Sequence, residues 1–283
     1  MNETILNQIL SKVKSFPTMP EAGAKMLSVL EDPDTEISDI EEILRYDPGL
    51  TANILKLANS AYFGIPSKIG SLKQAVMVLG FKRLKQLVVA SCVSAVMDKS
   101  VAGYDLPPGN LWRHSIAVSL AAEALVKDKK KTVSQDVFTP ALLHDVGKLV
   151  LGTFVKEELV AIKSIAAKGV PFVVAENMIL GTDHAEIGAQ ILTHWNFPKD
   201  VIHAVRWHHN PDSPKTITPQ MDIVYLANLL CQTADTGNGT GGQSVELSPA
   251  VIERLGVQLD QFEEISVKIA QWADDLSDTL AFN

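Results

Sequence analysis

The chain has 283 residues, of which 46% are hydrophobic and 6% aromatic, and its formal net charge is −8. This length suffices for one or two domains with a buried core, and the excess of Leu, Ile, Val and Ala over aromatic residues favours packed helices over a β-sandwich. Nucleic-acid-binding proteins normally present a basic face, so the acidic balance argues against DNA as a partner.

Two features of the sequence argue against a membrane or secreted protein. The first residues, MNETILNQILSK, lack the basic start and long apolar run of a signal peptide. The longest apolar stretch, Leu87–Met97, is shorter than the ~20 residues that a membrane-spanning helix needs. Cys92 and Cys231 lie in apolar helical contexts and are interpreted as buried thiols in a reducing compartment. We therefore expect a cytoplasmic protein that does not insert into a membrane.

The first ~100 residues have the helix punctuation of a compact all-α unit with four to six short helices. SDIEEILRY opens with Ser38 and Glu41, spaced as a capping box. Asp47 precedes PGLTANILKLAN as its expected N-cap, and Ser71 stands in the same position before LKQAVMVLG. Gly80 then separates that helix from FKRLKQLVVASCVSAVMD. This helix–Gly–helix pattern also resembles a DNA-reading motif, but the apolar continuation favours a buried core helix.

A connector rich in Pro and Gly (99–110) predicts a domain boundary. We expect an all-helical N-terminal subdomain at 1–98 and a helical subdomain at 110–235. Within the latter, one helix is expected to be capped by Thr139, with Pro140 as its first residue. The remainder, 236–283, is expected to be a flexible loop, TGNGTGGQS, followed by helices that pack on the second subdomain.

Histidines and one aspartate in the second half suggest a metal site, because imidazole is a preferred ligand of transition metals. Each group is expected on a different helix, and a helical bundle can direct such side chains into one pocket. A bound metal would lower the pKa of water and support phosphoester hydrolysis. His194 and His203 are interpreted instead as hydrogen-bonded core residues. The candidate ligands are His114, His144, Asp145, His184, His208 and His209.

The order H…HDVGK…H…HH resembles the HD phosphohydrolase superfamily, and DHAEIGAQILTHWNFPKDVIHAVRWHH is similar to the HD-GYP cyclic di-GMP phosphodiesterases. The first half resembles a more particular group. DPGLTANILKLANSAYFG and AVMVLG look like the N-terminal region of HDOD domains, the HD-related output domains of bacterial signalling. Together these resemblances cover nearly the whole chain.

The resemblance implies an HD-domain-like helical bundle preceded by an all-helical HDOD subdomain. It also implies that all six candidate ligands match HD or HD-GYP positions, with Asp145 as the bridging carboxylate. Lys148 matches the lysine that follows the HD pair, so Asp145 and Lys148 are the catalytic candidates should the site be active. The implied cofactor is a divalent transition metal (Fe, Mn, Ni or Zn).

The sequence also departs from the hydrolases. Where the closing aspartate of an HD site is expected, the chain has Asn228, a neutral and weak ligand. Asp222 and Asp235 lie nearby but not at the motif position, and the GYP signature is absent after the paired histidines.

Two functions remain open from the sequence. The resemblance and Asn228 favour a non-catalytic output or scaffold module that acts on signalling proteins, with its input supplied by another protein. The alternative is a metal-dependent phosphohydrolase acting on a nucleotide or cyclic dinucleotide.

Overall fold

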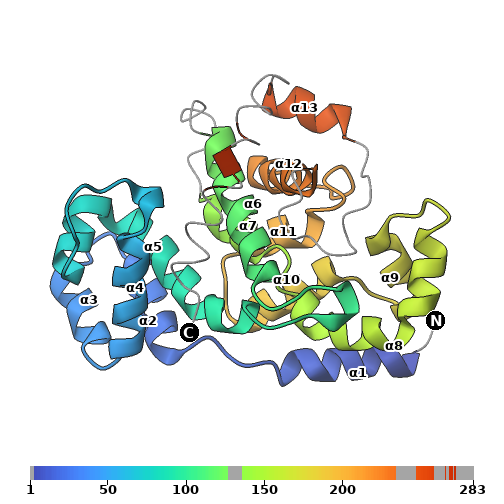
Figure 1. Ribbon diagram of the computed structural model, residues 1–283, viewed down its shortest axis with the longest axis horizontal. Coiled ribbons are helices and arrows are strands. Elements are labelled where there is room, and N and C mark those ends of the chain that lie inside the picture. Colours follow the sequence, from blue (N-terminus) through green and yellow to red (C-terminus); the bar gives the residue numbers. More distant parts are fainter. Residues whose placement is uncertain are drawn as a thin grey trace. The chain divides into compact units, whose positions relative to one another are not determined.

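The computed structural model describes residues 3–126, 136–233 and 247–257, and also 265, 268, 269 and 271 (Figure 1). These residues form α-helices and short 3-10 helices without any β-strand, and an isolated bridge joins Val101 to Leu106. The predicted all-α fold class is confirmed. The predicted loop at 236–244 and most of the last predicted helix lie outside the described residues. Among the described helices, none is both long and apolar enough to cross a membrane.

The described chain divides into two compact units, one from Thr18–Val96 and the other from Met1–Pro17 together with Met97–Ala273. The sequence predicted one subdomain at 1–98. In the structure, residues 1–17 belong to the other unit. In the structure, Trp195 donates a hydrogen bond from Nε1 to the carbonyl of Pro17 at 2.9 Å. Helix α1 (Glu3–Lys14) also packs on α8 (Lys148–Ala166) and α10 (His184–His194) of the second unit. The apolar face of α1 is visible in the sequence, but its partner is not.

Local residue patterns account for several helix ends in the Thr18–Val96 unit. The Asp47 side chain accepts from the amide of Leu50 at 2.9 Å, which confirms the predicted N-cap. Gly80 has φ +76°, a left-handed conformation that interrupts α5 where the sequence predicted a break. The helices of this unit are α2 (Glu21–Glu31), α3 (Ile37–Leu44), α4 (Pro48–Ala58), η1 (Ala61–Phe63) and α5 (Leu72–Met97).

The capping box predicted at Ser38 and Glu41 is wrong. Helix α3 begins earlier, and its capping box pairs Glu36 with Asp39. An acidic N-cap supplies the same acceptor oxygen as serine, so the local pattern fits two registers. The second half of α5 is a core helix, with Leu84 and Val88 fully buried.

The second unit is built around α6, which is buried along most of its length and packs against α7 and α12. Helix α11 contacts α7, α10 and α12, so these helices surround a common interior (Figure 1). The helices are α6 (Asn110–Val126), α7 (Phe138–Leu143), α8 (Lys148–Ala166), α9 (Phe172–Leu180), α10 (His184–His194), α11 (Lys199–Trp207), α12 (Pro219–Thr233) and α13 (Pro249–Leu255), together with η2 (Ala102–Tyr104).

The predicted start of α7 at Thr139 and Pro140 is wrong by two residues. The helix begins at Phe138, and the side chain of Asp136 accepts from the amides of Phe138 and Thr139. Thr139 itself donates to the same carboxylate. The acidic residue therefore provides the capping oxygen that was attributed to the threonine.

Candidate metal centre

The HD pair lies in the turn between α7 and α8, whereas the sequence suggested a helical position. Gly147 brings this turn into contact with α10. A Cβ atom at position 147 would lie 2.0 Å from the carbonyl oxygen of His184 and 2.6 Å from the amide of Gly188. These are backbone atoms, so no side-chain adjustment could relieve the overlap. Glycine in HDVGK therefore allows Asp145 to approach His184.

Four imidazoles converge on the carboxylate of Asp145, which is only 1% exposed. On the Oδ2 side, the Nε2 atoms of His144 and His114 lie at 3.2 and 3.7 Å. On the Oδ1 side, the Nε2 atoms of His184 and His208 lie at 3.4 and 3.8 Å. Residues from α6, α10 and two inter-helix turns thus meet at one buried anion.

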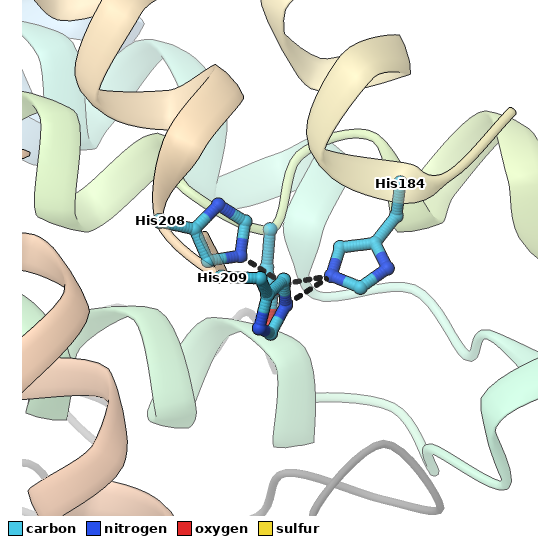
Figure 2. A group of neighbouring side chains, drawn as sticks. His184, His208 and His209 are labelled. Atoms are coloured by element: carbon cyan, nitrogen blue, oxygen red, sulfur yellow. Dashed lines mark hydrogen bonds and ion pairs between the residues drawn. The ribbon is translucent and has the colours of Figure 1, made fainter. Parts of the chain in front are cut away.

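His209 completes the group. Its Nε2 lies 2.8 Å from Nε2 of His184, and Figure 2 shows the rings of His184, His208 and His209 turned toward one another. The candidate ligand atoms form two sets that share Asp145, and within each set all atoms lie within 4.8 Å of one another. One set is Asp145, His184, His208 and His209, and the other is His114, His144 and Asp145. We call their union the Asp145 cluster: His114, His144, Asp145, His184, His208 and His209. The structure brings all six predicted residues together, and their binding of a metal stays a prediction.

Backbone carbonyls orient two of these imidazoles for metal coordination. His144 donates from Nδ1 to the carbonyl of Ala141, and His208 donates from Nδ1 to that of Val205, each at 2.7 Å. The lone pair of each ring is therefore on Nε2, which faces Asp145. Within the described part of the chain, both Nε2 atoms and Oδ1 of Asp145 are buried without a hydrogen-bond partner. Orphaned buried acceptors of this kind fit a divalent transition metal.

Glu176 on α9 is a part of the site that the sequence reasoning missed. It is fully buried, and its Oε2 accepts from Nδ1 of His184 at 2.8 Å. The only signal was an acidic residue inside the apolar helix FVVAENMIL. A charge on the buried face of a helix usually has a specific partner.

Lys148 follows the HD pair and is 4% exposed. Its Nζ lies 2.7 Å from Oδ2 of Asp145 and 5.3 Å from the ring centroid of Tyr104. The ammonium thus neutralises the carboxylate of Asp145 inside the core.

Asn228 lies in the site, at the position where the closing carboxylate was expected from the sequence. Asn228 accepts at Oδ1 from Nε2 of His114 over 3.1 Å. In this arrangement Nε2 of His114 carries a proton and offers no lone pair. Asp222 makes a two-bond ion pair with Arg254, at 2.7 and 2.8 Å, and Asp235 lies outside the described residues. Asn228 therefore leaves Asp145 as the central carboxylate of the described site.

A model of the HDOD domain matches residues 16–211, more than half of the chain. This protein belongs to the HDOD family. An HDOD domain protein of unknown function from Geobacter sulfurreducens has a TM-score of 0.79 at 23% identity, covering 99% of this chain and 98% of its own. A Shewanella amazonensis protein, whose name places it provisionally among the phosphohydrolases, has a TM-score of 0.75 at 25% identity, covering 96% and 98%.

Another relative, an uncharacterized protein of Treponema pallidum, is much longer than this chain. It is 28% identical over 230 residues, which are 80% of this chain and 44% of that protein. The HDOD chain therefore spans less than half of this relative.

Two other histidines of the HDOD chain lie outside the cluster. His203 donates from Nε2 to the carbonyl of Thr216 at 2.8 Å, which agrees with the predicted hydrogen bond, but its side chain is only partly buried and does not lie in the core. His194 is exposed, so its predicted core position is wrong. It is in the last turn of α10, where the helix emerges from the interior.

Three histidines of the Asp145 cluster, His114, His208 and His209, have lowered pKa values. Burial, followed by electrostatic interaction with the neighbouring His144, lowers the pKa of His114 to about 3. Burial and neighbouring histidines also hold the pKa values of His208 and His209 well below their usual range.

Neighbouring charges shift the pKa values of two groups of the Asp145 cluster against the effect of burial. Burial would lower the pKa of His184, but the charge of Glu176 outweighs it and raises that pKa. Burial would likewise raise the pKa of Asp145, but His144 and Lys148 outweigh it, and the carboxyl pKa is well below normal.

Acidification is expected to destabilise the metal-free HDOD protein. Below about pH 6.5 the unfolded chain protonates its histidines, whereas His114, His208 and His209 stay neutral in the fold. Their stabilising contribution is present above the unfolded pKa and is lost as pH falls. Each such histidine contributes a slope of about 1.4 kcal/mol per pH unit. The raised pKa of His184 adds no slope below about pH 6.5, because both states are then protonated.

Urea unfolding in EDTA at pH 7 and pH 5 measures this slope. The variant His208→Asn should show a smaller fall in the free energy of unfolding than the wild type. An equal free energy at both pH values in the wild type would contradict the burial of neutral histidines.

The cluster is bordered by a cleft of about 450 Å³ between α9 and α11. His209 lines it together with Trp207, Arg206, Met178 and Val174. The volume lies within the range of ~300–1,000 Å³ that small-molecule sites occupy. His209 thus connects the buried cluster to a concave surface.

Proposed function

We propose that this HDOD protein is a signal-output module that binds a divalent transition metal in the Asp145 cluster and acts through contacts with signalling proteins. The main support for the metal is three buried atoms without a hydrogen-bond partner: Nε2 of His144, Nε2 of His208 and Oδ1 of Asp145. The Nε2 of His144 lies 3.2 Å from Oδ2 of Asp145, and that of His208 lies 3.8 Å from Oδ1. Nitrogen and carboxylate donors at these separations suit Fe, Mn, Ni or Zn.

The residues of the cluster would have different roles toward the metal. Asp145 would supply the central anion, and His144, His184, His208 and His209 would supply imidazole nitrogens. Bound there, a metal would lower the pKa of a coordinated water. Among the six residues of the Asp145 cluster, Asp145 supplies the one carboxylate, and Lys148 already pairs with it. This limited negative charge supports a structural or sensing role over hydrolysis.

The alternative is a metal-dependent phosphohydrolase acting on a nucleotide or cyclic dinucleotide. Two observations favour it: His209 lines a cleft of about 450 Å³, and the Shewanella amazonensis relative carries a provisional phosphohydrolase name. In this reading, Asp145 and Lys148 would be the catalytic candidates.

Elemental mass spectrometry of the purified, untagged protein tests the metal. Near-stoichiometric Fe, Mn, Ni or Zn is expected. Stripping with a chelator and reloading each metal guards against loss during purification, and binding is then read as an increase in Tm. Absence of metal together with no increase in Tm would contradict the proposal. A reloaded protein that hydrolyses a cyclic dinucleotide would favour the enzymatic alternative.

A further inference from the structure

Glu176 is a fully buried carboxylate outside the set of candidate ligands. Its Oε2 accepts two hydrogen bonds from one residue: 3.0 Å from the amide of His184 and 2.8 Å from Nδ1 of the same histidine. An ionised carboxylate is costly to bury unless donors compensate it. Both hydrogen bonds accepted by Oε2 come from His184, so this oxygen of Glu176 is held against that residue.

The bond at Nδ1 determines which nitrogen of His184 can bind a metal. A carboxylate can only accept, so Nδ1 carries the proton and the neutral ring has its lone pair on Nε2. That Nε2 lies 3.4 Å from Oδ1 of Asp145 and 2.8 Å from Nε2 of His209. Without Glu176, the ring could take the other tautomer or rotate away from Asp145.

We propose that Glu176 is a positioning residue that holds His184 in the Nδ1–H tautomer and directs its Nε2 toward a metal in the Asp145 cluster. This inference rests on the proposed metal binding. His144 and His208 are oriented by neutral backbone carbonyls, whereas His184 is oriented by an anion. A carboxylate partner also makes the imidazole a stronger donor to the metal.

A purely structural role for Glu176 is the competing explanation, since its carboxylate also accepts from the first amide of α10. However, the side chain of Asp183 caps this helix independently by accepting from the amide of Glu186 at 2.9 Å. The amide oxygen of a glutamine at position 176 could still accept from the His184 amide. Glu176→Gln therefore removes the anion while retaining an acceptor for the helix start.

Titration of chelator-stripped protein with Co²⁺, followed by visible absorption and chelator competition, measures the effect. Glu176→Gln should bind Co²⁺ 10- to 100-fold more weakly than the wild type, with a changed ligand-field spectrum. Glu157→Gln, the same chemical change at an exposed position on α8, should match the wild type. Wild-type affinity in Glu176→Gln would overturn the inference and leave the proposed metal site intact. Failure of the wild type to bind Co²⁺ would instead contradict the proposed function.

A double-mutant cycle distinguishes positioning from general stabilisation. If Glu176 acts through His184, Glu176→Gln should cause no additional loss of Co²⁺ affinity in a His184→Ala background. Equal losses in both backgrounds would overturn the assignment.

Nitrogen-15 NMR of the imidazoles provides a test that needs neither metal nor a stable variant. In the metal-free wild type, the neutral His184 ring should carry its proton on Nδ1. A neutral ring protonated on Nε2 would overturn the inference.

Discussion

Asp145→Ala is expected to abolish metal binding and to lower the free energy of unfolding by about 3–5 kcal/mol. Four histidine nitrogens lie 3.2–3.8 Å from this carboxylate, and none of the remaining cluster residues supplies an anion. The ammonium of Lys148, 2.7 Å from Oδ2, would also lose its buried counter-ion. Elemental analysis measures the metal content, and urea unfolding in EDTA measures the stability of the metal-free protein.

Two further variants make this result interpretable. Asp145→Asn preserves the shape of the side chain, so it should lose metal even if the alanine variant folds poorly. Asp200→Ala removes an exposed carboxylate from the first turn of α11 and should retain the metal. Full metal content in Asp145→Asn would exclude Asp145 as the central ligand.

Asn228→Asp is expected to change stability in opposite directions with and without metal. In EDTA, a second carboxylate would be buried near Asp145, and we expect a loss of about 1–3 kcal/mol. With a divalent metal bound, the added anion neutralises positive charge at short range, where unit charges interact by about 4 kcal/mol at an effective dielectric of ~20. Part of this gain is offset by desolvation, so we expect metal to bind at least about tenfold more tightly.

Thermal unfolding in EDTA and in excess Zn²⁺ tests this reversal of sign. The Tm of Asn228→Asp should be below that of the wild type in EDTA and above it in Zn²⁺. Asn7→Asp, an exposed change on α1, should give the same difference from the wild type in both solutions. A Tm shift of one sign in both conditions would show that position 228 does not face the metal.

Local residue patterns in the sequence were sufficient for the helical architecture and for several helix ends. Asp47 and Gly80 act through atoms within one turn of the chain, so their roles can be recognised without tertiary contacts. Acidic caps at Glu36 and Asp136 were missed because serine, threonine and acidic side chains offer equivalent oxygens in adjacent registers.

The order of the histidines and the HD pair identified the candidate ligands from sequence, and the match to the HDOD family confirmed the resemblance. The sequence also placed Asn228 where a carboxylate was expected. These conclusions depend on residue type and order, which the sequence contains directly.

Only the tertiary structure decided how these residues are used. The convergence on Asp145 depends on helices that are distant in the chain, and the lone pairs of His144 and His208 are set by carbonyls that local sequence does not distinguish. Glu176 lies on a separate helix from His184, and its role appears only when α9 and α10 are placed together. Residue identity determines which donors are available, whereas packing determines which atoms face one another.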